Sequence, residues 1–142
     1  MTEEKKDFFV SDISLSYQYT AGNATTRFLN KVAEGKLVAQ KCPKCSAVYV
    51  PPRGSCPRCG VATEEELELP DTGAVESFTI VHIPIPGNPI VPPYVSAMIR
   101  LDGADISFLH LIQEIDLADI RIGMRVQAVW KDKSDWGTTL EL

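Results

Sequence analysis

Two short motifs, Cys42-Pro43-Lys44-Cys45 and Cys56-Pro57-Arg58-Cys59-Gly60, contain all four cysteines of the chain and lie ten residues apart. A C-x-x-C motif turns tightly enough to point two sulfurs at one centre, and two such motifs complete a tetrahedron of thiolates. Proline after the first cysteine of each motif fixes φ, and glycine after the last cysteine tolerates a positive φ. The spacing therefore predicts a zinc ribbon in which one Zn²⁺ is bound by Cys42, Cys45, Cys56 and Cys59.

The predicted metal site has a structural rather than a catalytic character. Four sulfurs leave no open position for water or substrate. A ribbon of about twenty residues buries too little apolar surface to fold alone, and a metal-binding free energy of roughly 10–16 kcal/mol supplies the difference. Iron in a rubredoxin-type site is an alternative, because its ligand set is the same. Two disulfides are a further alternative, which a reducing compartment disfavours.

The composition indicates a soluble cytoplasmic protein. The 142 residues carry 14 basic and 19 acidic side chains, so the formal net charge is −5, and 44% of the residues are hydrophobic. No apolar run reaches the length of about 20 residues that a membrane span needs. The segment from Met1 to Asp7 is polar and charged and therefore is no signal peptide. An acidic chain also makes a poor general nucleic-acid binder.

Three regions are expected along the chain: an N-terminal arm and helix (1–35), the zinc ribbon (36–63) and a β-barrel region (64–142). In the arm, Ile13, Leu15, Tyr17 and Tyr19 alternate with polar residues, which predicts an extended amphipathic segment. Residues 23–34 have helical periodicity, and Gly35 is placed to end the helix. The acidic residues 64–68 are expected to be a connector.

The barrel region has the pattern of short antiparallel strands. Strands are expected at 74–83, 94–101, 105–112, 124–130 and 138–142. Five prolines between residues 84 and 93 require a loop or an edge, because proline cannot donate to a strand ladder. Asp102-Gly103 is a hairpin-turn signal. The predicted fold class is thus mainly β: an arm and a short helix, a four-cysteine zinc ribbon, then a small five-stranded antiparallel barrel of OB type.

The sequence offers no catalytic residue. Nucleophilic catalysis needs a nucleophile beside a base, and the metal site uses every cysteine. The two histidines, His82 and His110, lie in predicted strands between apolar neighbours. No glycine-rich phosphate loop of Walker or Rossmann spacing is present. We therefore expect no turnover by this chain alone.

The order of helix, ribbon and barrel resembles a known family: rubredoxin-like zinc-ribbon plus OB-fold proteins encoded beside thiolase-like genes, long catalogued as a domain of unknown function. The resemblance covers nearly the whole chain from about Tyr17. It rests on the two cysteine motifs, on Pro51-Pro52-Arg53 between them, and on a set of barrel motifs. These barrel motifs are Asp71-Thr72-Gly73, Phe78-Thr79-Ile80-Val81-His82, Pro93-Tyr94, Ile99-Arg100-Leu101-Asp102-Gly103 and Ile122-Gly123-Met124-Arg125-Val126.

The resemblance implies a non-catalytic accessory subunit of a thiolase-fold enzyme that acts on acyl-coenzyme A, either a thiolase or a retro-aldolase. Its settings include archaeal mevalonate-pathway thiolase complexes, steroid side-chain degradation and benzoylsuccinyl-CoA cleavage. The implied complex is a hetero-oligomer around a thiolase dimer, required for degradation of a lipid or an aromatic compound. Members of the family usually continue past the last strand with a short tail that contains an aromatic residue and a proline, whereas this sequence stops at Leu142.

Two candidate surfaces follow from this implied function. Ile13, Leu15, Tyr17 and Tyr19 are expected to dock on the partner enzyme; packing on the chain's own barrel is the competing interpretation. Arg53, Phe78, His82 and Tyr94, together with the proline-rich segment between residues 84 and 93, are candidate contacts for coenzyme A. This ligand needs cations beside aromatic and aliphatic surface and would be bound mainly by the partner. For Arg53 the alternative is capping of ribbon carbonyls. Two other functions stay open, a nucleic-acid-binding module and a rubredoxin-like metal protein.

Overall fold

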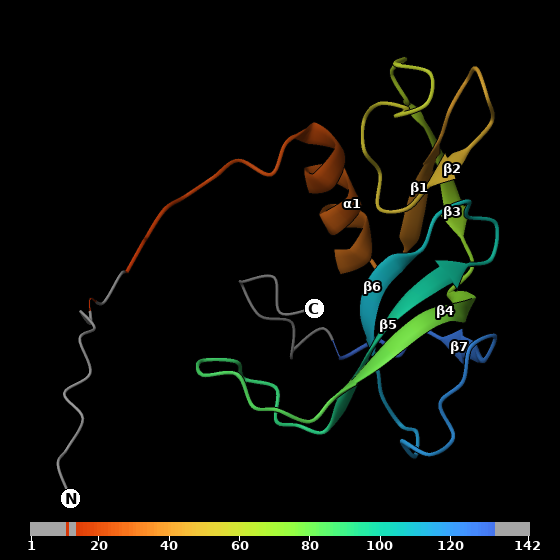
Figure 1. The fold of residues 1–142 in the computed structure, drawn as a ribbon. Coiled ribbons are helices and arrows are strands. Elements are labelled where there is room, and N and C mark those ends of the chain that lie inside the picture. The colour runs from red at the N-terminus through yellow and green to blue at the C-terminus, as the bar shows by residue number, and fades with distance from the viewer. Residues whose placement is uncertain (1–10, 12–13, 133–142) are drawn as a thin grey trace, which may run out of the picture.

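The computed structural model describes residue 11 and residues 14–132. They form one helix and seven strands in two antiparallel sheets (Figure 1). The mainly β fold class with one short helix, a four-cysteine cluster and antiparallel sheets is confirmed. The elements are α1 (Asn23–Ala33), β1 (Leu37–Lys41), β2 (Val48–Tyr49), β3 (Glu65–Leu69), β4 (Thr72–Val81), β5 (Tyr94–Leu101), β6 (Phe108–Ile112) and β7 (Arg125–Gln127).

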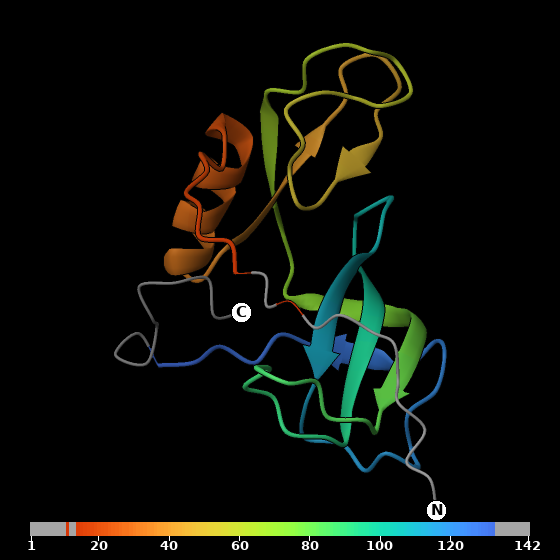
Figure 2. The ribbon, with the colours of Figure 1, turned by 60° about the vertical axis from the view of Figure 1, so that its left-hand side comes forward.

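Helix α1 is amphipathic and packs beside β1 (Figures 1 and 2). Its residues Phe28, Leu29 and Val32 are half-buried, and Phe28 reaches the main hydrophobic core. The helix ends where Gly35 adopts a φ of 80° and donates its N–H to the Val32 carbonyl at 2.8 Å. The predicted helix is confirmed to within one residue. No helix of the described residues is long and apolar enough to cross a membrane.

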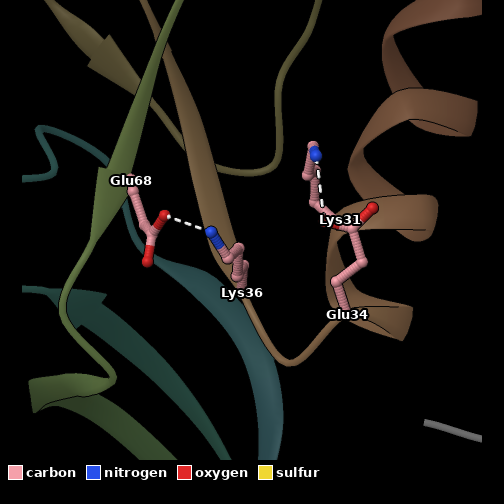
Figure 3. A network of polar contacts seen from close by, with 4 residues as sticks. All are labelled: Lys31, Glu34, Lys36 and Glu68. Atoms are coloured by element: carbon pink, nitrogen blue, oxygen red, sulfur yellow. Dashed lines mark hydrogen bonds and ion pairs between the residues drawn. The ribbon is translucent and has the colours of Figure 1, made fainter.

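The ribbon sheet has the strand order β2-β1-β3. The expectation of a connector at residues 64–68 is wrong, because β3 pairs with β1 from Leu37↔Leu69 to Lys41↔Glu65. Two of the three glutamates of β3 form ion pairs with nearby basic side chains. Lys36 Nζ lies 3.1 Å from Glu68 Oε2 (Figure 3), and Arg27 Nε lies 3.4 Å from Glu66 Oε1. This pairing explains why an acidic segment is a strand here.

The second sheet, from the barrel region, has the strand order β6-β5-β4-β7. Strands β4 and β5 pair from Gly73↔Leu101 to Val81↔Tyr94, with an irregularity between Val75 and Ser77. The apolar face predicted for β5 is confirmed: its four residues are at most 7% exposed. They are Val95, Ala97, Ile99 and Leu101. Predicted strands at 74–83, 94–101, 105–112 and 124–130 correspond to β4–β7, and the expected strand at 138–142 lies outside the described residues.

The connection between β5 and β6 is longer than the Asp102-Gly103 turn signal predicts. Strand β6 begins only at Phe108. Asp105 is turned away from the sheet because it binds the ribbon: its N–H donates to the Val48 carbonyl at 3.0 Å, and its Oδ2 accepts from the Val48 N–H at 2.8 Å. This reciprocal pair of hydrogen bonds ties β2 of the ribbon to the barrel region.

The ribbon and the barrel region share one hydrophobic core. Ala39, Val48 and Val50 of the ribbon belong to the same buried cluster as Val75 and Ile99 of the second sheet. Figures 1 and 2 show the ribbon sheet set against one end of the second sheet, with β3 leading directly into β4. The position of the cysteine motifs is therefore fixed relative to the barrel region.

Candidate metal centre

The four cysteine sulfurs converge in the ribbon. All lie within 4.8 Å of one another, and Cys45 Sγ is 3.7 Å from Cys56 Sγ. All four thiols are free rather than joined as disulfides. A tetrahedron of sulfurs with metal–sulfur bonds of 2.3 Å has edges of about 3.8 Å. The thiolate set and its spacing therefore fit a tetrahedral metal ion such as zinc.

The two cysteine motifs form matching turns. In each turn the first cysteine accepts a backbone hydrogen bond from the residue four positions later and donates one to the carbonyl five positions later. Ser46 and Gly60 occupy equivalent places with φ of 62° and 66°. The bonds are Ser46 N to Cys42 O (2.9 Å), Cys42 N to Ala47 O (2.8 Å), Gly60 N to Cys56 O (2.9 Å) and Cys56 N to Val61 O (2.8 Å).

Backbone N–H groups also point at the sulfur atoms. The N–H groups of Lys44 and Cys45 each lie 3.4 Å from Cys42 Sγ. In the second turn, the equivalent backbone groups of Arg58 and Cys59 hydrogen-bond to Cys56 and help to lower the pKa of its thiol. Such bonds stabilise a thiolate, which is the form that binds a metal.

Tyr49 supplies a side-chain hydrogen bond to this centre. Its hydroxyl lies 3.2 Å from Cys56 Sγ, and the residue is only 3% exposed. The hydrogen bond is the main cause that lowers the pKa of Cys56 to about 6, and it raises the pKa of Tyr49 itself to about 12. Sequence reasoning missed Tyr49, because no local pattern connects it to Cys56, which lies seven residues later.

The four sulfurs crowd one another. The hydrogen bond with Cys45 and partial burial raise the pKa of Cys59 to about 12. A bound dication would offset this crowding by accepting electron density from all four thiolates. The four cysteines would then close the coordination sphere and hold the two turns together, leaving no position for a reactant.

Gln40 connects β1 to the second cysteine turn. Its side chain is fully buried, and its Oε1 accepts hydrogen bonds from the Gly54 N–H at 3.0 Å and the Thr63 hydroxyl at 3.1 Å. The Gln40 Nε2 atom has no hydrogen-bond partner among the described residues. No local pattern indicates this role of Gln40, since its contacts span up to 23 residues.

The four candidate coenzyme A contacts fall into two places. Tyr94 pairs with Val81, which is the last residue of β4, and His82 directly follows Val81 in the chain. Phe78 lies on β4 three residues before Val81. Phe78 also lines a shallow depression of about 250 Å³ on this sheet. Arg53 is exposed and belongs to the ribbon. Figures 1 and 2 show the segment between β4 and β5 at the end of the sheet away from the ribbon, so Arg53 is not grouped with the other three.

The described part of the arm is exposed. Leu15, Tyr17 and Tyr19 are 82%, 79% and 76% exposed, and the rings of Tyr17 and Tyr19 are 6.4 Å apart. Ile13 lies outside the described residues. These three side chains therefore make little contact with the rest of the described chain.

Two protein-family models match the chain. Residues 30–65 match the rubredoxin-like zinc ribbon domain of ChsH2, and residues 66–131 match its C-terminal OB-fold domain. Together with the clustered sulfurs, the ribbon match indicates a structural metal site, and the second match identifies the barrel region as an OB-fold.

Curated relatives are similar over about two thirds of the chain. A DUF35 domain-containing scaffold protein of Methanocaldococcus jannaschii is 37% identical over 97 residues, which is 67% of each chain. A probable enoyl-CoA hydratase alpha subunit of Thermomonospora curvata is 34% identical over 95 residues, 67% of this chain. The match spans only 29% of that longer relative.

Solved structures have the same arrangement. A DUF35-family protein of unknown function from Sulfolobus solfataricus matches with a TM-score of 0.62 and 28% identity, covering 75% of this chain and 76% of that chain. A chain of the Ltp2-ChsH2(DUF35) aldolase matches with a TM-score of 0.66 and 28% identity, covering 81% and 90%. The chain thus belongs to the ChsH2 family of zinc-ribbon and OB-fold proteins, also described as DUF35 proteins.

Proposed function

We propose that this chain is a non-catalytic accessory subunit of a thiolase-fold enzyme that acts on an acyl-CoA, as a thiolase or a retro-aldolase. The observation that carries the proposal is the match to the Ltp2-ChsH2(DUF35) aldolase, which covers 90% of that chain. A relative described as a scaffold protein and another described as a subunit of an enoyl-CoA hydratase support the same role. Four free thiols favour a reducing compartment, and hence the cytoplasm.

The side chains of the described residues support a role without chemistry of its own. All four cysteines are gathered at the metal centre. His110 packs against Phe108, with ring centroids 6.0 Å apart, and its Nδ1 lies 3.2 Å from the Leu111 carbonyl oxygen. Cleavage or formation of a carbon–carbon bond beside a thioester needs a base and an oxyanion site. In this proposal the partner supplies both, and the metal-bound ribbon holds the partner's acyl-CoA entrance in its active shape.

The arm is proposed to dock on the partner through Ile13, Leu15, Tyr17 and Tyr19. The high exposure of the last three favours docking over packing on the chain's own barrel. Exposed aromatic and aliphatic side chains of this kind mark interaction sites. A chain that begins at residue 21 is expected to keep its fold and to lose the partner.

Coenzyme A contacts are proposed for Arg53 and for the group Phe78, His82 and Tyr94. Because Arg53 belongs to the ribbon and the other three residues to the second sheet and the start of its β4–β5 connection, a single acyl-CoA of the partner is expected to meet only one of the two places. Arg53→Ala and Phe78→Ala, each assayed in the assembled complex, should therefore differ: one raises the KM for acyl-CoA and the other leaves it unchanged. An unchanged KM for both would remove the ligand role.

Co-purification tests the central proposal. The chain carries an affinity tag and is co-expressed with the thiolase-fold protein encoded beside it. We expect the two proteins to elute together, the complex to cleave or form an acyl-CoA, and the tagged chain alone to show no turnover. A matched control carries Cys42→Ser and Cys56→Ser, which should abolish assembly because the ribbon loses its metal. A thiolase-fold protein that stays fully active alone, or turnover by the isolated chain, contradicts the proposal.

A further inference from the structure

We propose that residues 82–93, the proline loop, form a second docking element that inserts into an uncharged apolar groove of the partner subunit. The inference rests on the proposed function, since it requires a partner enzyme. It adds a contact at the opposite end of the second sheet from the ribbon, where Figures 1 and 2 show the segment between β4 and β5.

The proline loop is mostly apolar and carries no formal charge. It contains no Asp, Glu, Lys or Arg, and it holds five of the chain's ten prolines. Three of its aliphatic side chains are displayed to solvent: Ile83 is 77% exposed, Ile85 58% and Val91 81%. Removing such side chains from water is favourable, and their clustering on one loop distinguishes them from scattered surface residues.

The loop is braced from within by Asn88. The Asn88 N–H donates to the Ile85 carbonyl at 3.0 Å, and Asn88 Oδ1 accepts from the Ile90 N–H at 3.0 Å. Its Nδ2 donates to the Tyr94 hydroxyl at 3.3 Å, which ties the loop to the start of β5. Prolines restrict φ further. A loop held in this way loses little conformational entropy when it binds, which favours docking.

Charge decides what kind of surface the loop fits. With no lysine or arginine among its twelve residues, the loop is a poor match for phosphate groups and for anionic lipid headgroups, which proteins bind mainly through Lys and Arg. With no anion either, it has nothing to offer a basic patch. The complementary surface is therefore an apolar protein groove without charge.

The arm and the loop can serve one partner together. In Figure 1 the described arm residues 14–20 and the proline loop both project to the left of the molecule, while the ribbon and the second sheet lie to the right. One partner surface that reaches both would bury the exposed side chains of both segments. Because the arm is proposed to dock on the partner enzyme, this shared direction favours the partner enzyme over a second copy of this chain.

Single charges introduced into the loop test the proposal. Ile83→Asp and Val91→Asp are compared with Ile122→Asp, a control at a 68% exposed aliphatic residue on a different loop. Affinity for the co-purified thiolase-fold subunit is measured by titration calorimetry. We expect the two loop variants to raise Kd at least about tenfold, and the control to leave it within about twofold.

Asn88→Ala keeps every aliphatic side chain of the loop but removes the hydrogen bonds of the Asn88 side chain, and it should raise Kd by an intermediate factor. Unchanged thermal unfolding shows that each variant is folded.

The possible outcomes separate this inference from the function on which it rests. If the unaltered chain binds the thiolase-fold subunit and the loop variants bind it equally well, the loop inference is wrong and the proposed function stands. If the unaltered chain does not bind, both fail. Weakening by the Ile122→Asp control to the same extent indicates a general charge effect and overturns the loop's role. The loop would have another occupant if the chain alone sediments as a dimer and the loop variants sediment as monomers. The same holds if the chain binds phosphatidylcholine vesicles and the loop variants do not.

Discussion

Tyr49 shows how one buried side chain can tune the metal centre from outside the ligand set. Its hydroxyl hydrogen-bonds to Cys56 Sγ at 3.2 Å and favours the thiolate. Partners of metal ligands typically change metal affinity by about 10–100-fold when they are removed. We expect Tyr49→Phe to raise the zinc dissociation constant about tenfold, measured by competition with a chromogenic chelator.

Tyr17→Phe is the matched control, because Tyr17 is exposed and belongs to the arm rather than to the metal centre. It should leave the zinc affinity unchanged. Equal affinities for the Tyr49→Phe variant and the unaltered chain would show that the hydroxyl has no influence on the metal.

Asp102 carries a pH-dependent contribution to stability. Its carboxylate accepts hydrogen bonds from both terminal nitrogens of Arg125 and from the Thr72 hydroxyl at 2.6 Å, and these hold its pKa well below the usual range. A group whose pKa is lowered by folding stabilises the protein above its unfolded pKa, near 3.9, and loses this effect as the pH falls toward the folded pKa. Because both partners are largely exposed, we expect Asp102→Asn to lower the unfolding midpoint at pH 7 by only a few degrees.

The pH series provides the check. The difference in midpoint between Asp102→Asn and the unaltered chain should be constant from pH 7 to pH 5 and shrink steadily below pH 4. Asp119→Asn, at an exposed aspartate, is the control and should show no such trend. A difference that grows on acidification would contradict the assigned role of Asp102.

Single residues also mark the limit of what the sequence predicts. The four cysteines were identified from their spacing alone, because each turn is local. Gln40 and Asp105 were missed, because their partners lie 14 to 57 residues away. The sequence predicts Asp105 as the first residue of a strand, whereas its hydrogen bonds to Val48 depend on how the ribbon meets the barrel region.

At the scale of elements, Gly73 shows how closely β4 and β5 approach. A Cβ at this position would lie 2.6 Å from the Arg100 carbonyl oxygen and 3.1 Å from Leu101 Cα, both backbone atoms that cannot rotate away. We therefore expect Gly73→Ala to lower the free energy of unfolding by about 1–3 kcal/mol, measured in denaturant. Ser77→Ala, at an exposed position of the same strand, should cost under about 0.5 kcal/mol. Equal stabilities of the two variants would mean that the strands separate freely at Gly73.

The elements differ in how well the sequence predicts them. Helix α1 and strand β5 follow from local periodicity, since one apolar face of each lies against the core. Strand β3 does not, because its five residues include three glutamates, and such composition disfavours a strand until the neighbouring chain is known. Its pairing depends on β1 and on Lys36 and Arg27, which no local pattern connects to it.

At the scale of the whole molecule, the regions expected from the sequence pack against one another more closely than their separate patterns indicate. Local spacing predicts a metal-dependent ribbon and an OB-fold, and it predicts their order. It does not predict that Val48 and Val50 of the ribbon are buried together with Val75 and Val95 of the second sheet. That shared core arises from contacts between the ribbon and the barrel region, which the sequence pattern predicts as separate regions.

The shared core predicts that metal removal weakens the OB-fold as well as the ribbon. Elemental analysis should first show one zinc per chain; one iron instead would assign the site to the rubredoxin-type alternative. A metal present at a hundred times its Kd stabilises the folded state by about 2.7 kcal/mol. This free energy corresponds to a roughly hundredfold slower exchange of those amides that exchange only when the whole domain unfolds. We expect chelation to accelerate hydrogen exchange at the β4–β5 amides by at least this factor, because Asp105 and the buried valines couple these strands to the ribbon.

Asp105→Ala removes the side-chain hydrogen bond to Val48 and should reduce the acceleration that chelation causes. Unchanged protection of β4 and β5 in a chelated protein whose ribbon exchanges freely would show that the two parts fold independently.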